Sequence, residues 1–154
     1  MKRTQIIDLD GCISDDTARR SLIRPNSHPD PFEWFRAYHR LCHLDQARNL
    51  HEVERMNGTR IVVITARPTE TKDQTMHWLY KHNIQPYAMI MRNPFDHRPS
   101  VEVKRSAVHW LLDYYGVARE DVVDAIDDRE DIIMMYRNYF GFPARIIRIG
   151  EEGL

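Results

Sequence analysis

The sequence predicts an α/β protein built on an open, mostly parallel sheet with helices on both faces. From residue 60 onward, short apolar runs alternate with longer segments of helical periodicity, which is the pattern of consecutive βαβ units. The first apolar run, residues 4–8, is short and does not alternate with polar residues. Such a run is typical of a strand that is buried on both faces of a parallel sheet.

The elements of this sheet can be placed in order along the chain. The expected strands are residues 4–8, 61–64, 87–91, 121–126 and 144–149. The expected helices are residues 69–82, residues 100–115, and a segment after strand four that Gly141 stops. Ser100 is expected to cap the second of these helices. The inward face of this helix is expected to carry Val103, Ala107, Trp110, Leu111 and Tyr114.

Residues 11–59 form an insert between the first two strands of this pattern. Gly11 to Arg24 is polar and is expected to be irregular, while Asp30 and Pro31 are a plausible N-cap and first residue of a helix. A second helical piece is expected over residues 44–56. The insert is too short for a large cap domain, so the prediction is a single domain, residues 1–154, with a minimal helical cap.

Composition excludes several classes of protein. The net charge is −1, with 22 basic and 23 acidic residues, whereas a non-specific nucleic-acid binder usually has a large basic excess. No apolar run reaches the roughly 18 residues of a membrane helix. Cys12 and Cys42 lack metal-ligand spacing. We therefore expect a cytoplasmic protein without membrane contact, in which both cysteines are packing residues.

The stretch from Ile6 to Gly11 carries the first sign of chemistry. Asp8 and Asp10 follow a buried strand directly and are separated by one residue. Residues i and i+2 of a strand point to the same side, so both carboxylates would project from one strand end. They repel each other unless a cation lies between them, and oxygen ligands suit Mg2+. Alone, this motif also fits an acidic turn.

Other strand ends supply complementary groups. Strand two ends in Thr65 and Arg67, strand four leads into Asp127 and Asp128, and Lys104 lies in an early turn of the preceding helix. In an open α/β sheet, ligands bind beyond the carboxyl ends of the strands. The acids are suitable ligands for Mg2+, and the hydroxyl and the two cations are suitable for binding an anion. Together they predict a metal site next to a phosphate site. Taken singly, Asp127 and Asp128 could instead cap a helix.

This set of motifs resembles a known superfamily. Asp8-Leu9-Asp10-Gly11, Ile64-Thr65, Lys104 and Ile126-Asp127-Asp128 are similar, in order and in position, to the four signature motifs of the haloacid dehalogenase (HAD) phosphohydrolases. Within the superfamily, residues 62–67 and 125–129 are most similar to the 3′-phosphatase domain of bacteriophage polynucleotide kinase. The likeness covers about two thirds of the chain and is weak between residues 19 and 58.

The resemblance implies a HAD fold and a role for each motif residue. Asp8 would be the nucleophile that forms an aspartyl-phosphate, and Asp10 would be the general acid and then the general base. The metal ligands would be Asp8, the backbone carbonyl of Asp10, Asp127 and Asp128, with Mg2+ as the cofactor. Thr65, Arg67 and Lys104 would bind the phosphate of the substrate. The substrate would be a nucleic-acid 3′ end.

Other interpretations remain open from the sequence. One is a small-molecule phosphatase such as a 5′(3′)-nucleotidase; another is a regulatory domain that resembles a response-regulator receiver. Basic and aromatic residues of the insert, including Arg19, Phe35, Arg36 and His39, could contact phosphates and stack on bases, or could simply be core and surface. Asp124, inside strand four, has Arg60 as a possible partner.

Overall fold

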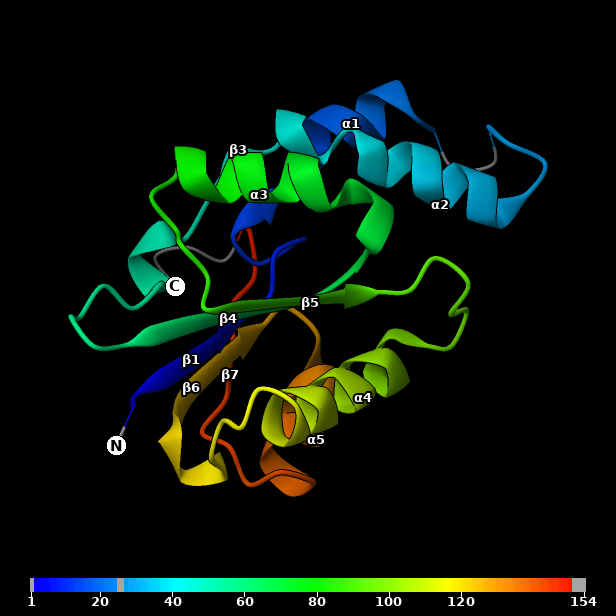
Figure 1. Cartoon of the computed structure of the whole chain (residues 1–154). Coiled ribbons are helices and arrows are strands. Elements are labelled where there is room, and N and C mark those ends of the chain that lie inside the picture. Colours follow the sequence, from blue (N-terminus) through cyan, green and yellow to red (C-terminus); the bar gives the residue numbers. More distant parts are fainter. Residues whose placement is uncertain (1, 25–26, 151–154) are drawn as a thin grey trace.

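The computed structural model describes residues 2–24 and 27–150. Its centre is a parallel five-stranded sheet in the order β5-β4-β1-β6-β7, which confirms the predicted fold class (Figure 1). The strands are β1 (Thr4–Ile7), β4 (Arg60–Pro68), β5 (Ala88–Arg92), β6 (Val122–Asp127) and β7 (Arg145–Ile146). The last strand is shorter than the expected 144–149. The predicted domain of residues 1–154 includes positions 1, 25–26 and 151–154, which lie outside the described residues.

The central strand β1 is buried throughout because both of its faces are covered. Ile6 faces one apolar cluster, and its neighbour Ile7 faces the other, as the alternation of side chains along a strand requires. Val62 and Val63 on the adjacent strand β4 divide in the same way. Two separate cores therefore hold the sheet, one on each face.

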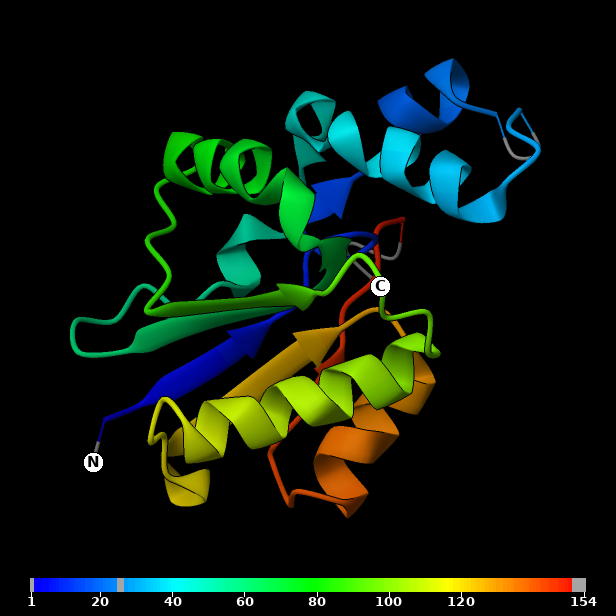
Figure 2. The ribbon, with the colours of Figure 1, turned by 45° about the vertical axis from the view of Figure 1, so that its right-hand side comes forward.

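Helices cover both faces of the sheet. On one face lies α3 (Lys72–Lys81), and on the other lie α4 (Ser100–Asp113) and α5 (Glu130–Asn138) (Figures 1 and 2). Val103 and Leu111 of α4 are buried as expected, but Trp110 and Tyr114 are exposed and stack on each other. Their predicted inward position was wrong, because this stacked pair lies on the outer face of the helix. Short 3-10 turns, Thr69–Thr71 and Arg119–Asp121, precede α3 and β6.

The insert contains two helices that project beyond the carboxyl ends of the strands (Figure 2). They are α1 (Thr17–Leu22) and α2 (Pro31–Arg40). The predicted start of α2 is confirmed, since Pro31 is its first residue and the Asp30 side chain accepts a hydrogen bond from Phe32 N. The expectation of irregular chain up to Arg24 was wrong, because α1 forms there with Asp15 accepting from Thr17 N.

The expected helix over residues 44–56 was also wrong. That segment forms 3-10 turns at Cys42–Leu44 and Leu50–Glu52, separated by β3 (Gln46–Ala47), which pairs with β2 (Ser14–Asp15). Asn49 adopts a left-handed conformation with φ 53°, and its side chain donates to Cys12 O. Hydrogen bonds to distant backbone thus replace helical ones, which sequence periodicity does not reveal.

Two smaller expectations fail for local reasons. Ser100 begins α4 without capping it, and its hydroxyl instead accepts a hydrogen bond from Arg92. Asp124 is held by Arg145 and Gln5 and not by Arg60. Both cysteines are buried and unpaired, as predicted. Within the described ranges, 2–24 and 27–150, no helix has the length and apolar character needed to cross a membrane.

The strand order fixes where ligands can approach. The chain runs from β1 through β4 to β5 and then returns to the opposite side of β1 for β6. The direction of progression reverses between β1 and β6, and in open α/β sheets the crevice outside the carboxyl ends at such a reversal binds ligands. Asp8 follows β1, and Asp127 ends β6, so the predicted residues lie at this crevice.

Candidate active site

Three carboxylates converge at the reversal between β1 and β6. Asp8, Asp127 and Asp128 each offer an oxygen, and these oxygens all lie within 4.8 Å of one another. Asp8 is fixed by its backbone, since Asp8 N donates to Ile126 O at 3.1 Å. Asp8 and Asp127 are buried, while Asp128 is half-buried. Among the described residues, this is the one group of three or more acidic, histidine or cysteine side chains close enough to hold a metal ion together.

Lys104 bridges two of these carboxylates. Its Nζ donates to Asp8 Oδ1 at 2.8 Å and to Asp127 Oδ2 at 2.6 Å. Burial by itself would lower the pKa of Lys104, but the charges of Asp127 and Asp8 outweigh it and raise this pKa well above its ordinary value. The lysine is therefore a permanent cation that fixes the orientation of the Asp8 carboxylate.

The carboxylate cluster has the chemistry of a site for a hard divalent cation. Burial, followed by the charge of Asp127, raises the pKa of Asp8 well above its usual range, and burial also raises the pKa of Asp128. A single lysine does not offset three crowded carboxylates. A cation among their oxygens would relieve the repulsion, and oxygen-only ligands suit Mg2+ or a similar ion.

Gly11 allows Asp128 to approach the end of β1. Its φ is +78°, and a Cβ added at this position would lie 2.5 Å from Asp128 Oδ2. The glycine of the Asp8-Leu9-Asp10-Gly11 motif is therefore required for two reasons, a left-handed backbone and the space that the Asp128 carboxylate occupies.

Asp10 lies outside the carboxylate cluster and faces arginines. Arg67 contacts both carboxylate oxygens of Asp10, with Nη2 to Oδ1 at 2.8 Å and Nε to Oδ2 at 3.2 Å. Arg19 Nη2 makes a further ion pair with Asp10 Oδ1. Both guanidinium groups are fully buried, whereas the Asp10 side chain is 26% exposed. The buried guanidinium groups thus hold the Asp10 carboxylate on one side, while its other side is accessible to solvent.

A second layer of contacts holds the two arginines. Asp45, itself fully buried, accepts from Arg19 Nε at 2.9 Å and from Arg19 Nη2 at 2.6 Å. Arg67 donates to Ser14 Oγ at 3.0 Å and to Thr75 Oγ1 at 3.2 Å. Each guanidinium around Asp10 is thus held by several buried partners, and removing one partner of such a network is strongly destabilising.

His39 completes this network as a neutral group. Its Nδ1 lies 3.0 Å from Arg19 Nη1 and 3.6 Å from Asp10 Oδ2. Burial, only partly opposed by the charge of Asp10, lowers the pKa of His39 to about 3. Nδ1 therefore accepts the hydrogen bond from Arg19 near neutral pH. His39 is a buried member of the Asp10 network, whereas His43, four residues later in the sequence, is exposed.

The surroundings of Asp10 determine its protonation state. Burial would raise the pKa of Asp10, but the charges of Arg67 and Arg19 bring it far below its usual range. Asp10 is a carboxylate at neutral pH in this arrangement. Because its pKa is so low it is a weak base, so it can accept and donate a proton only after its contacts with the arginines weaken.

The remaining predicted residue, Thr65, lies on β4. Parallel pairing places Ile7 opposite Val63, so Thr65 lies just beyond the end of β1, on the same edge as Asp8. Thr65 Oγ1 accepts from Arg67 N at 3.1 Å, and its hydroxyl hydrogen can donate elsewhere. A cavity of about 440 Å³ opens over Asp10 and Asp128 and is bordered by Arg20 and Arg148, which gives access to these two carboxylates.

The structure brings all of the predicted site residues to one edge of the sheet, but in two groups. Asp8, Lys104, Asp127 and Asp128 form the first group; Asp10 and Arg67 form the second, with Thr65 adjacent through its bond to Arg67 N. The sequence did not indicate a role for Ser14 or Asp45. It indicated Arg19 and His39 only as residues that could contact the phosphates or bases of a nucleic acid. No motif marks these four, because α1 is too short to show periodicity and Asp45 lies in a segment expected to be helical.

Comparisons with known proteins agree with this geometry. A parallel α/β sheet with two acids at the end of its first strand, a lysine and a further acid pair fits the HAD-type phosphatases that the motifs resemble. Residues 2–150 match the family of the polynucleotide kinase PNKP phosphatase domain. The chain belongs to this family, which confirms the resemblance drawn from its motifs.

Solved structures show the same fold. The chain superposes on the structure of the Pnkp1/Rnl/Hen1 RNA repair complex with a TM-score of 0.69 and 19% identity, covering 98% of this chain and 44% of that one. A second structure of the Pnkp1/Rnl/Hen1 complex gives a TM-score of 0.67 and 19% identity, with 96% and 46% covered. The chain thus spans less than half the length of these solved chains. No curated protein matches it.

Proposed function

We propose that this protein is a Mg2+-dependent phosphomonoesterase that removes 3′-phosphates from nucleic-acid ends through an aspartyl-phosphate on Asp8. One observation carries the proposal: Asp8 is a buried carboxylate held by Lys104 beside Asp127 and Asp128. A carboxylate fixed in this way can attack phosphorus and form a covalent intermediate. A bound metal ion would neutralise charge on both the substrate phosphate and the carboxylates.

Asp10 has the position and environment for two proton transfers. When a phosphate dianion enters, it competes with Asp10 for the guanidinium groups of Arg67 and Arg19. This competition raises the pKa of Asp10, so that the carboxyl group can donate a proton to the leaving oxygen. Once the leaving group departs, the same carboxylate accepts a proton from the water that hydrolyses the intermediate. The predicted phosphate contact of Arg67 is part of this exchange.

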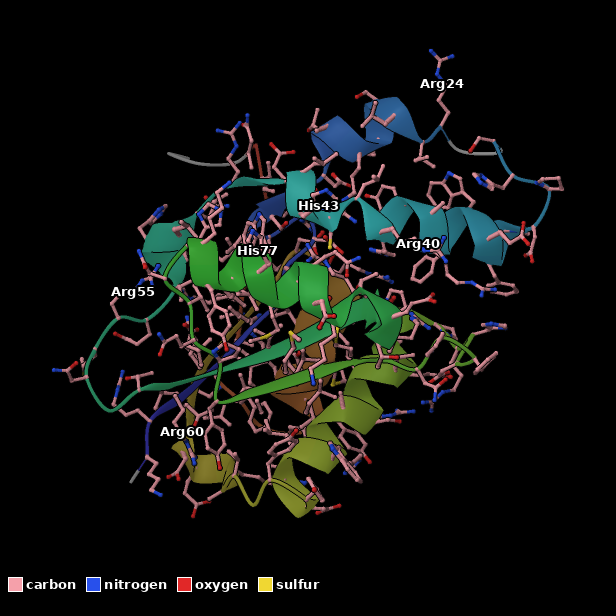
Figure 3. The ribbon with its side chains drawn as sticks, turned by 45° about the horizontal axis from the view of Figure 1, so that its top comes forward. Arg24, Arg40, His43, Arg55, Arg60 and His77 are labelled. Atoms are coloured by element: carbon pink, nitrogen blue, oxygen red, sulfur yellow. The ribbon has the colours of Figure 1, made fainter. Side chains whose placement is uncertain are left out.

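The family and the fold favour a nucleic-acid substrate. The matching family is described as a polynucleotide kinase phosphatase domain, and the structural relatives belong to an RNA repair complex. The insert adds only two short helices over the site, so the end of a polymer can reach Asp10. Figure 3 shows Arg24 and Arg40 on the helical part of the insert, and Arg55 and Arg60 on the opposite side of the molecule.

A substrate panel tests the proposal. The protein is incubated with Mg2+ and with matched oligonucleotides phosphorylated at the 3′ or the 5′ end, in DNA and RNA form, and with mononucleotides. We expect phosphate release from the 3′-phosphorylated oligonucleotides, with loss of release when a chelator is added. Preferential turnover of mononucleotides would contradict the nucleic-acid proposal and identify a nucleotidase.

The nucleophile is tested by a charge-removing variant. Asp8→Asn keeps the shape of the side chain but cannot form an aspartyl-phosphate, and we expect kcat to fall by at least about 10⁴-fold. Asp113→Asn, an exposed acid of α4, is the matched control and should retain full activity. Activity that survives in Asp8→Asn would exclude the covalent route. Turnover in excess of enzyme would also exclude a receiver-like phospho-acceptor, whose acidic acceptor at the third strand end is replaced here by Arg92.

A further inference from the structure

A groove lies between the insert and the core, apart from the carboxylate cluster. It is lined by the first turn of α2 and by the loop that joins β5 to α4. Its volume is about 300 Å³, which is at the lower end of the range for small-ligand sites. We call it the aromatic groove. Its main lining residues are Pro31, Phe32, Phe35, Pro68, Arg92 and His97.

Flat rings form the walls of the aromatic groove. Phe32 of α2 stacks on His97 of the β5–α4 loop, with 3.6 Å between ring centroids and 12° between planes. Phe32 is nevertheless 42% exposed. Segments 65 residues apart in sequence thus present an accessible stacking surface, of the kind on which the bases of single strands pack.

Positive charge surrounds these rings. Arg36, Arg92 and Arg98 border the aromatic groove, and Asp96 is the acid among its lining residues. Asp96 is paired with Arg98 at 2.8 Å. The Arg92 guanidinium lies 5.8 Å from the centroid of the Phe35 ring. Rings combined with arginines suit a ligand that has an aromatic face and an anionic backbone.

The aromatic groove is close to the proposed proton donor. The Phe35 ring, which lines it, packs against the His39 ring at 4.4 Å between centroids, and His39 Nδ1 lies 3.6 Å from Asp10 Oδ2. A second connection is the hydrogen bond that Arg92 Nε donates to Ala66 O at 3.2 Å. Ala66 lies in the sequence between Thr65 and Arg67, the two residues expected to bind phosphate. These contacts place the aromatic groove one buried side chain, His39, away from Asp10, whose proposed role is to protonate the leaving oxygen.

We propose that the aromatic groove binds a nucleobase of the strand that carries the reacting phosphate. This inference rests on the proposed function and deepens it, since it assigns the part of the leaving group that the enzyme recognises. The base stacks on the outer face of the stacked pair Phe32 and His97, while the half-exposed guanidinium of Arg36 at the rim contacts an adjacent phosphate. Stacking tolerates every base, so the groove would select a nucleoside end without selecting its sequence.

An apolar side chain of a protein partner is the competing occupant. A groove that binds an apolar side chain does not need arginines at its border, and it does not need to lie near Asp10. Both features are expected if the occupant is covalently connected to the reacting phosphate. The nucleobase is therefore the occupant that the geometry favours, and the experiment below distinguishes the two.

The test compares two 3′-phosphorylated oligonucleotides of equal length, one intact and one with abasic sugars at its last two positions. For the wild type we expect KM to be about 5- to 150-fold lower on the intact strand, the range that base–aromatic stacking energies give. Phe32→Ala should raise KM on the intact strand and leave KM on the abasic strand unchanged. This pattern isolates the contact between ring and base.

Two further variants control the result. Phe32→Tyr keeps the ring and should restore the preference for the intact strand. Trp110→Ala removes an equally exposed stacked ring from α4 and should preserve that preference. An equal rise of KM on both strands in Phe32→Ala, or no change on either, would overturn the inference alone. Failure of the wild type to hydrolyse either strand would overturn the proposed function, and the inference with it.

Discussion

Asp8 and Asp10 are separated by one residue at the end of the same strand, yet their surroundings are opposite. Asp8 is crowded by the carboxylates of Asp127 and Asp128, and its pKa is raised by burial and by those charges. Asp10 is surrounded by Arg67 and Arg19, and its pKa is lowered. The surroundings of Asp8 therefore carry an excess of negative charge, whereas the surroundings of Asp10 carry an excess of positive charge.

In the proposed reaction, this difference divides the chemistry between the two acids. The carboxylates around Asp8 would bind the cation, and Asp8 would face phosphorus. Asp10 would exchange its arginine partners when the substrate phosphate arrives, so that its proton affinity would depend on the substrate. Environments that push apart the pKa values of neighbouring acids are a general means of assigning separate roles.

The largest expected effect concerns stability without metal. Asp10→Asn leaves Arg19 and Arg67 with an incomplete set of buried partners, so we expect the free energy of unfolding to fall by about 3–5 kcal/mol. Asp8→Asn removes one of three crowded carboxylates, so its melting temperature in chelator should rise. Thermal unfolding of both variants beside the wild type measures the contrast. Equal shifts in the same direction would contradict the proposed difference between the two environments.

Gly11 offers a sharper test of the carboxylate cluster. Gly11→Ala and Gly58→Ala both place an alanine at positive φ, which should cost each variant about 1–2 kcal/mol of unfolding free energy. Only at Gly11 does the new Cβ meet a side chain, Asp128 Oδ2. We therefore expect Gly11→Ala alone to lose about 10- to 100-fold in metal affinity, measured by metal titration of activity. Equal affinity in the two variants would show that Asp128 does not contact the ion.

The smallest expected effect is the pH dependence of the Asp10 contribution. Its pKa is lowered by folding, so its stabilisation is complete above its unfolded pKa of about 3.9 and is lost as the pH falls below that value. The stability difference between wild type and Asp10→Asn should therefore narrow by up to about 1.4 kcal/mol per pH unit below pH 4. Denaturant unfolding between pH 3 and pH 7 measures it. A constant difference would mean that Asp10 is not stabilised as a carboxylate.

The regular part of the fold followed closely from the sequence. The strands around Ile6 and Val63 were predictable because burial on both faces needs an unbroken apolar run, and this requirement is local. The insert was not predictable to the same degree. Its segment around Asn49 is held by bonds to Cys12 O and by the pairing of β3 with β2, and these partners lie far away in sequence.

The same division holds for the site. Asp8, Lys104, Asp127 and Asp128 were predictable because each lies at a strand end or in an early turn of a helix at the carboxyl edge, so topology alone brings them together. Asp45 and Arg19 were not, because their roles depend on how α1 and the segment around Asp45 fold over Asp10. A buried arginine has the same sequence signal as an exposed one until its partner is known.

The sequence by itself determined the class of protein, the parallel sheet and the acidic motif at the end of its first strand, because these follow from local periodicity and from residues next to strand ends. Only the tertiary structure decided that Asp8 faces carboxylates while Asp10 faces arginines, and that rings of the insert and the core form the aromatic groove. Electrostatic environment and ring stacking depend on distances in space between residues remote in the chain, and no local pattern records them.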